Sequence, residues 1–150
     1  GGEFKAAIEE NIASGVITVL NENDALSNIE LAKLAYGGDN DGLAAHTAIT
    51  LGAKKLYLMT DQRGIRRSDT NRTGIRFVAA NERSQRSIFN HIDDVNDGAG
   101  RGGMASKGRA AIEAANAGVT VYIADAKSSF RSIHNSGKSQ SSTEFEAKKQ

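Results

Sequence analysis

Apolar side chains recur at helical spacing in four segments of the chain, which predicts four helices. These segments are residues 4–12, 43–51, 88–95 and 103–116. Gly15, Gly52 and Gly118 stand just beyond three of them, where a left-handed glycine commonly ends a helix. The pattern therefore predicts both the helices and their C-terminal stops.

Three short runs rich in apolar and β-branched residues lie between the helices and predict strands. They cover residues 16–20, 55–60 and 119–124. Strands alternating with helices are typical of a mainly parallel sheet with right-handed crossovers, covered on both faces. We therefore expect a three-layer α/β sandwich, with residues 16–20 as a buried strand.

Three stretches fit this alternation less well. Residues 63–78 are basic and interrupted by glycine, and we interpret them as a projecting hairpin or loop. Residues 26–36 are compatible with a helix or a hairpin. From Ala126 the chain becomes polar and serine-rich, with Phe145 as an apolar remnant. Residues 1–125 are therefore expected to form one domain, and residues 126–150 a tail that is disordered or adds a late strand.

Composition narrows the function classes. A chain of 150 residues with 39% hydrophobic and 25% charged residues is typical of a soluble globular domain. The net charge of +1 predicts no strong attraction to nucleic acid or membranes. The absence of cysteine excludes disulfides and thiolate metal sites, and no apolar run is long enough to span a membrane. We expect a cytoplasmic protein.

Polar residues follow each predicted strand, and these ends should meet at one edge of a parallel sheet, where ligands usually bind. The three sets are Asn21-Glu22-Asn23-Asp24, Thr60-Asp61 and Asp125. Each set alone is more often a turn former than a site. Three such sets at the same edge of the sheet favour a ligand-binding site.

A second acidic feature, Asp39-Asn40-Asp41, stands between glycines at the start of a predicted helix. One of these side chains could cap the helix. Three consecutive polar residues exceed that need, and neighbouring carboxylates repel each other unless a cation or donor lies between them. We therefore favour a polar site over a simple cap.

The stretch from Gly100 to Lys107 (Gly-Arg-Gly-Gly-Met-Ala-Ser-Lys) combines flexible glycines with a lysine at the start of a helix. Backbone N–H groups of such a loop can approach phosphate oxygens, and the helix N-terminus favours negative charge. Neither the dinucleotide fingerprint nor the P-loop pattern is matched. Together with the acidic turn, the loop suggests Mg-nucleotide chemistry.

The remaining candidates favour structural roles. His46, His91 and His134 are scattered without metal-ligand spacing, so no metal site is predicted from them. The arginines of residues 63–76 suit a solvated loop better than a patch that contacts a nucleotide or a neighbouring subunit.

Taken in order, these motifs resemble the amino acid kinase family, and within it the glutamate 5-kinase branch. The resemblance covers about residues 4–125 and rests on residues 15–24, 38–45, 56–64, 100–107 and 117–124. It implies phosphorylation of the glutamate side-chain carboxylate by Mg-ATP, the first step of proline biosynthesis. No nucleic acid or membrane partner is implied.

The resemblance also assigns roles to individual residues. Asp24 and Asn40 would bind the amino-acid substrate, and Asp41 would orient catalytic lysines, of which Lys107 would neutralise charge on the transferred phosphoryl group. The remaining nucleotide contacts would come from Thr60, Asp61, Arg101, Gly102, Gly103, Met104, Ala105 and Ser106.

Departures from the family pattern qualify this expectation. The resemblance begins within the family's domain, so that its first strand, with a lysine and a glycine-rich loop, has no counterpart in this sequence. Arg101 and Thr18 replace residues usual in the family. We therefore expect weak or no activity from this chain alone, and either a homo-oligomer or a complementary chain. The alternative is a non-catalytic interaction protein on a degenerate kinase scaffold.

Overall fold

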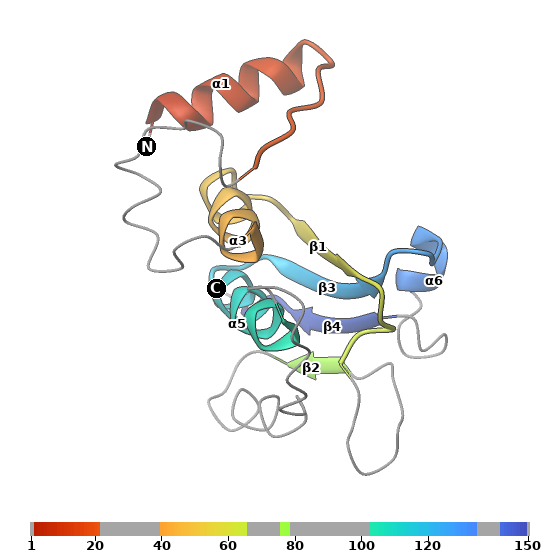
Figure 1. Cartoon of the computed structure of the whole chain (residues 1–150). Helices are drawn as coiled ribbons and strands as arrows, with labels where there is room; N and C mark the ends of the chain where they lie inside the picture. Colours follow the sequence, from red (N-terminus) through yellow and green to blue (C-terminus); the bar gives the residue numbers. More distant parts are fainter. Residues whose placement is uncertain (1, 22–39, 66–75, 79–102, 135–141, 150) are drawn as a thin grey trace.

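The computed structural model describes residues 2–21, 40–65, 76–78, 103–134 and 142–149, and all structural statements below concern this part of the chain. It contains four helices and four strands (Figure 1). The helices are α1 (Gly2–Ala13), α3 (Asn40–Thr50), α5 (Met104–Asn116) and α6 (Phe130–His134). The strands are β1 (Lys55–Thr60), β2 (Arg76–Val78), β3 (Thr120–Asp125) and β4 (Ser142–Glu146).

The four strands form one mixed sheet in the order β1-β3-β4-β2. Strand β1 pairs with β3 in parallel, with Lys55 beside Thr120 and Thr60 beside Asp125. Strand β4 runs antiparallel to β3 and parallel to β2. The parallel β1–β3 pair confirms the α/β class, and the antiparallel β4 is an addition that the helix–strand alternation did not predict.

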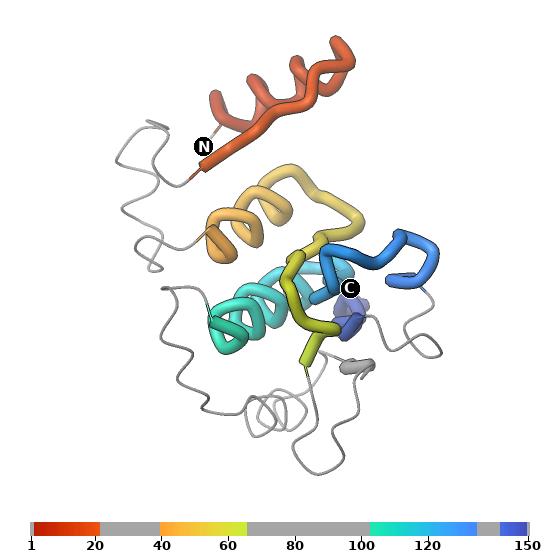
Figure 2. The backbone as a smooth tube through the Cα atoms, turned by 45° about the vertical axis from the view of Figure 1, so that its right-hand side comes forward, coloured from red at the N-terminus to blue at the C-terminus, as the bar shows by residue number. Residues whose placement is uncertain are grey.

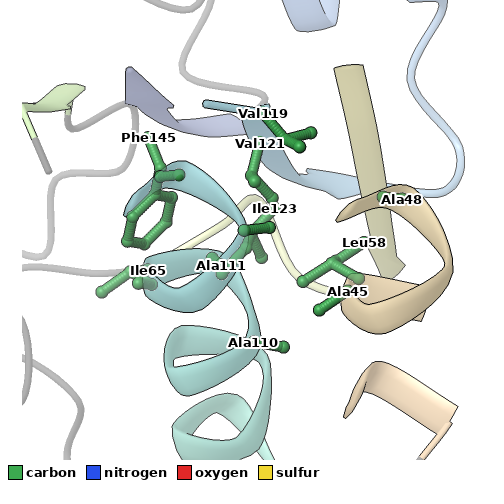
Figure 3. Close-up of a cluster of buried hydrophobic side chains, with 12 residues drawn as sticks. Ala45, Ala48, Leu58, Ile65, Ala110, Ala111, Val119, Val121, Ile123 and Phe145 are labelled. Carbon is green, nitrogen blue, oxygen red and sulfur yellow. The ribbon is translucent and has the colours of Figure 1, made fainter. Parts of the chain in front are cut away.

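The main core lies between the sheet and the two helices α3 and α5. Side chains from alternate positions of β1, β3 and β4, with Leu58, Val121, Ile123 and Phe145 among them, point into it (Figure 3). Phe145 is fully buried, which stabilises the fold by about 2–3 kcal/mol relative to an exposed ring. Strand β4 is therefore an integral part of this core.

Alanines line the helix side of the core and let the two helices approach closely. Buried alanines are Ala45 and Ala48 of α3 and Ala110, Ala111, Ala114 and Ala115 of α5. Alanine is also the strongest helix former, so these positions favour both the helices and their contact. Figures 1 and 2 show α3 and α5 side by side over the sheet.

The opposite face of the sheet carries a smaller cluster under α6. Tyr122, Ala124 and Ile133 are buried there, and Tyr57 packs against them. The Tyr57 and Tyr122 rings stack with centroids 5.4 Å apart. The Tyr57 hydroxyl is hydrogen-bonded to Nε2 of His134 at 2.5 Å, which ties α6 to β1. Helices thus lie on both faces of the sheet, although α6 is short.

Residues 16–20, predicted as a buried strand, form no strand in the described structure, and that prediction is wrong here. The segment is extended and exposed, with 89% of Ile17 and 84% of Val19 accessible to solvent. Among the described residues β1 is the edge of the sheet on that side, and no strand pairs with it there. These residues do have a high intrinsic preference for strands, but a strand also needs a neighbouring strand to which it can be hydrogen-bonded.

The other predicted elements are confirmed where the structure describes them. The helices predicted at 4–12, 43–51 and 103–116 correspond to α1, α3 and α5, and the strands at 55–60 and 119–124 to β1 and β3. Gly15, Gly52 and Gly118 all have positive φ, as predicted for helix stops. The predictions for residues 26–36 and 88–95 lie outside the described residues.

Two segments that were expected to be a hairpin or loop (63–78) and a disordered tail or late strand (126–150) contribute strands. The stretch 63–78, interpreted as a hairpin or loop, contains β2, which pairs with β4 and not with a neighbour in the sequence. The serine-rich stretch after Ala126 contains α6 and β4. No helix within the described ranges is both long and apolar enough to cross a bilayer.

The turn after β1 is fastened to β4 by a close approach of backbone. Gly64 has φ +88°, and a Cβ at this position would lie 2.6 Å from Oγ1 of Thr143. The backbone N–H of Ile65 donates to the same oxygen at 2.8 Å. Only glycine fits this contact without displacing β4.

Candidate functional site

Asp41 belongs to the side of α3 that faces α5. It precedes Ala45 by one turn and Ala48 by two, so it continues the alanine stripe towards the start of the helix. Only 9% of the residue is exposed. An acidic residue in the first turn also interacts favourably with the helix dipole.

Lys107 occupies the corresponding position on α5, one turn into the helix. It precedes Ala111 by four residues, so it lies at the N-terminal end of the stripe that packs against α3. The helix is preceded by Gly103 in an extended conformation, and no side chain caps it there. The carbonyl of Gly103 accepts from the N–H of Ser106 and of Lys107, at 3.0 and 3.3 Å.

The two side chains meet as a bidentate ion pair. Nζ of Lys107 lies 3.0 Å from both Oδ1 and Oδ2 of Asp41. The side chains are only 17% and 12% exposed, so the attraction is less screened than at the surface. Close packing of the alanines below brings the helices near enough for the lysine stem to span the gap.

This pair joins the acidic turn and the glycine-rich loop, which are 66 residues apart in the sequence. The helix N-terminus itself favours negative charge, so the start of α5, beside Gly103, is a position that a phosphate could approach. Asp41 fixes the position of the Lys107 ammonium, because an aspartate with two equivalent contacts restricts the rotamers of the lysine.

Thr60 ends β1 and Asp61 follows it at the carboxyl end of the sheet, and Asp125 ends the neighbouring β3. Their described side-chain hydrogen bonds are local. Thr60 Oγ1 donates to Oδ1 of Asp61 at 3.3 Å and accepts from the N–H of Gln62 at 3.4 Å. Oδ1 of Asp125 accepts from the N–H of Lys127 at 2.9 Å. These bonds are the ones expected if the residues only form turns, and they are also compatible with binding of a ligand.

The predicted site residues therefore divide into three groups. The structure brings Asp41 and Lys107 into contact, and Gly103, Met104, Ala105 and Ser106 form the start of α5 beside them. Asn40 begins α3 next to Asp41 and is exposed. Thr60 and Asp61 lie at the end of β1. The third group, Asp24, Arg101 and Gly102, lies outside the described residues.

Two of the predicted site residues also have a structural role in packing. Met104 contacts the main core while partly exposed, and Ser106 is buried. The Tyr57–His134 hydrogen bond had no signal in the sequence, because its partners are 77 residues apart and no local pattern links them. Burial raises the pKa of the Tyr57 hydroxyl above its usual value near 10.

Within the described ranges, no three carboxylate, histidine or cysteine side chains lie close enough together to hold a metal ion. Mg²⁺ in kinases is usually held by one or two carboxylates together with the substrate phosphates.

Comparison with known proteins identifies relatives over most of the chain. The model of the amino acid kinase family matches residues 3–125. Glutamate 5-kinase of Shigella flexneri is 38% identical over 125 residues, which are 81% of this chain and 31% of that protein. Glutamate 5-kinase of Yersinia enterocolitica is 41% identical over 113 residues, 73% of this chain and 29% of that protein. The chain thus spans about a third of the length of the curated relatives it matches.

Proposed function

The chain belongs to the amino acid kinase family, and on this basis we propose that it carries the nucleotide half of a phosphotransferase site. The reaction would transfer the γ-phosphoryl group of Mg-ATP to the side-chain carboxylate of glutamate, as the names of the relatives suggest. The product would be the acyl phosphate that opens proline biosynthesis.

The observation that carries this proposal is the contact between Lys107 and Asp41. Phosphoryl transfer needs little covalent chemistry from a protein, since positioning and electrostatic stabilisation supply most of the rate. A lysine held at 3.0 Å from both oxygens of a buried aspartate is positioned before substrate arrives. Such preorganisation removes reorganisation cost at the moment of reaction.

The start of α5 would receive the phosphates. Residues 103–105 would present backbone N–H groups beside Ser106, with Arg101 and Gly102 preceding them in the loop. Lys107 would then balance the negative charge that develops on the transferred group. Thr60 and Asp61, at the end of β1, would contact the nucleotide, and Asp24 and Asn40 the glutamate. Mg²⁺ bound with the nucleotide would neutralise part of the phosphate charge.

The chain covers only part of the length of its relatives, and this lowers the activity that we expect from it. It spans 29–31% of those proteins, so some groups that act on substrate in them need not be present in these residues. Loss of one preorganised donor commonly costs on the order of 10²–10³ in rate. We therefore expect Mg-ATP binding to be easier to detect than turnover, and activity to need an oligomer or a complementary chain.

The test is binding of Mg-ATP followed by titration calorimetry and by thermal unfolding. The proposal predicts heat of binding and a raised melting temperature for the unsubstituted chain, and a loss of affinity of at least about ten-fold for Lys107→Met. Lys5→Met is the control, because Lys5 lies on exposed α1 and forms an exposed pair with Glu9 at 3.7 Å. Absence of binding by a folded unsubstituted chain, or equal affinity for all three proteins, would refute the nucleotide assignment and favour a non-catalytic interaction protein.

A further inference from the structure

Residues 61–65 form the turn that leaves β1, and this turn runs along the carboxyl edge of the parallel strands. In the strand order β1-β3-β4-β2, the chain passes from the end of β1 across the end of β3 to the start of β4 (Figure 1). Ligands of open α/β sheets usually bind at this edge. The position of the turn therefore decides where Thr60 and Asp61 lie in the candidate site.

The turn is fixed at both of its ends. At its beginning, the carbonyl of Thr60 accepts a hydrogen bond from the backbone N–H of Ala126 at 2.8 Å, which ties the turn to the end of β3. At its other end, the backbone N–H of Ile65 donates to Oγ1 of Thr143 in β4, also at 2.8 Å. Between these two points Asp61 is exposed, so its side chain is accessible to a ligand.

Thr143 is a fully buried polar residue at the second position of β4. It lies beside Ile123 of β3, on the face of the sheet that carries Phe145 and the main core. A buried hydroxyl or N–H group costs free energy unless it is hydrogen-bonded. The bond between Thr143 and Ile65 therefore satisfies a buried donor and a buried acceptor at once.

The backbone of β4 also approaches the turn closely. Gly64 has φ +88°, and a Cβ at this position would lie 2.6 Å from Oγ1 and 2.7 Å from the backbone nitrogen of Thr143. Ile65, which follows it, is 1% exposed and packs in the main core. The side chain and the backbone of Thr143 thus form the surface against which the end of the turn rests.

We propose that Thr143 is a positioning residue of the candidate site, which fixes the turn 61–65 so that Thr60 and Asp61 can receive the nucleoside part of a nucleotide. This inference rests on the proposed function and extends it to a residue that contacts no ligand. Thr143 acts through the N–H of Ile65, and its own side chain stays in the core.

The nucleoside is the part of the ligand that suits this turn. A carboxylate such as that of Asp61 accepts hydrogen bonds from ribose hydroxyls or from an amino group of the base, and it repels phosphate oxygens. The phosphates are assigned to the start of α5, where the helix N-terminus favours negative charge. A displaced turn should therefore weaken binding of the nucleoside part and leave binding of the phosphates unchanged.

Three substitutions in β4 separate this role from a general contribution to stability. Thr143→Val removes the hydroxyl and keeps a branched side chain of similar volume, whereas Thr143→Ser keeps the hydroxyl. Ser142→Ala is the matched control, because Ser142 is also fully buried and its hydroxyl donates at 2.8 Å to the carbonyl of Ile133 in α6. The control therefore loses a hydrogen bond of the same length that does not involve the turn.

The measurement is titration calorimetry with Mg-ATP and with Mg-tripolyphosphate, which lacks the nucleoside, on variants shown to be folded by circular dichroism. For Thr143→Val we expect an affinity for Mg-ATP that is lower by about ten-fold and an unchanged affinity for Mg-tripolyphosphate. Thr143→Ser and Ser142→Ala should bind both ligands as the unsubstituted chain does.

Unchanged Mg-ATP affinity in Thr143→Val, an equal loss for both ligands, or the same loss in Ser142→Ala would overturn the proposal. The first result would show that the turn does not depend on Thr143, and the other two would show a general structural effect. Absence of Mg-ATP binding by the folded unsubstituted chain would refute the proposed function, and the positioning role together with it. The two failures are thus distinguishable.

Amide hydrogen exchange of the unsubstituted chain tests the same contact without any substitution. The N–H of Ile65 should exchange slowly, and Mg-ATP should slow its exchange more than that of the β3 amides, because the bound nucleoside stabilises the turn. Mg-tripolyphosphate should lack this additional effect. Exchange of the Ile65 amide at the rate of exposed groups, or equal protection by both ligands, would overturn the proposal.

Discussion

Substitution of Lys107 by methionine tests the ion pair that organises the candidate site. Methionine keeps most of the apolar stem but removes the ammonium that lies 3.0 Å from both oxygens of Asp41. The Asp41 side chain is only 12% exposed, so its charge is left poorly solvated. Removing one partner of a fully buried pair costs about 3–5 kcal/mol, and the residual exposure lowers our expectation to about 2 kcal/mol.

The size of the interaction itself comes from a double-mutant cycle with Asp41→Asn. We expect the double variant to be more stable than the sum of the single effects predicts, with a coupling energy of about 1–2 kcal/mol. For a chain of this size, a loss of about 2 kcal/mol lowers the melting temperature by about 4–8 °C. Urea unfolding of the four proteins gives the free energies of unfolding directly.

The exposed pair of Lys5 and Glu9 on α1 is the matched control. Its atoms are 3.7 Å apart and its side chains 46% and 56% exposed, so its coupling energy should be about 0.5 kcal/mol or less. A coupling energy for Asp41 and Lys107 no larger than this control would show that the contact does not hold the lysine in place. The argument for a preorganised ammonium would then fail.

Three further substitutions test the packing of the sheet. Gly64→Ala should destabilise the protein by at least about 2 kcal/mol in urea unfolding, because the new Cβ collides with Thr143. Gly52→Ala is its control, because Gly52 has a positive φ but open space around it, and this substitution should cost only about 1 kcal/mol. Equal losses of stability for the two variants would refute the close approach at Gly64. Ser142→Ala should cost about 1–2 kcal/mol, since its hydroxyl donates to a buried carbonyl of α6 at 2.8 Å; an unchanged melting temperature would contradict this. Because burial raises the pKa of Tyr57, its neutral form stabilises the fold fully below pH 10 and this contribution is lost as the pH rises through the folded-state pKa. Tyr57→Phe should therefore make stability fall less steeply above pH 10, and an identical slope would count against the burial effect.

Local patterns in the sequence were sufficient for most helices and for the parallel pair of strands. The stripes of α1, α3 and α5 and their glycine stops depend on residues within one or two turns, so they are readable without the fold. The pairing of β4 between β3 and β2 is different. It depends on contacts such as that of Thr143 with Ile65, 78 residues away, which no local pattern contains.

Residues 16–20 show that a local preference for β structure is not sufficient to form a strand. Val16, Ile17 and Val19 favour a strand intrinsically, yet they are exposed and unpaired with β1 in the described structure. Strand formation is decided by a neighbour and by cover on both faces, and both are properties of the assembled molecule.

The candidate site was predictable as two separate motifs, and only the structure shows them in contact. The acidic turn and the glycine-rich loop each had a structural alternative in the sequence. The turn residues Thr60, Asp61 and Asp125 still fit such an alternative through their local hydrogen bonds. Asp41 does more than begin a helix, because its carboxylate pairs with Lys107.

The central claim is that the start of α5, with Lys107 held by Asp41, binds the phosphates of a nucleotide. The most direct measurement is a titration of the isotope-labelled chain with Mg-ATP, followed by the backbone amide resonances of residues 103–107 in nuclear magnetic resonance spectra. We predict that these amides shift first and saturably, and that Asp41→Asn weakens the effect. Saturable shifts confined to other parts of the chain, with residues 103–107 unchanged, would contradict the account.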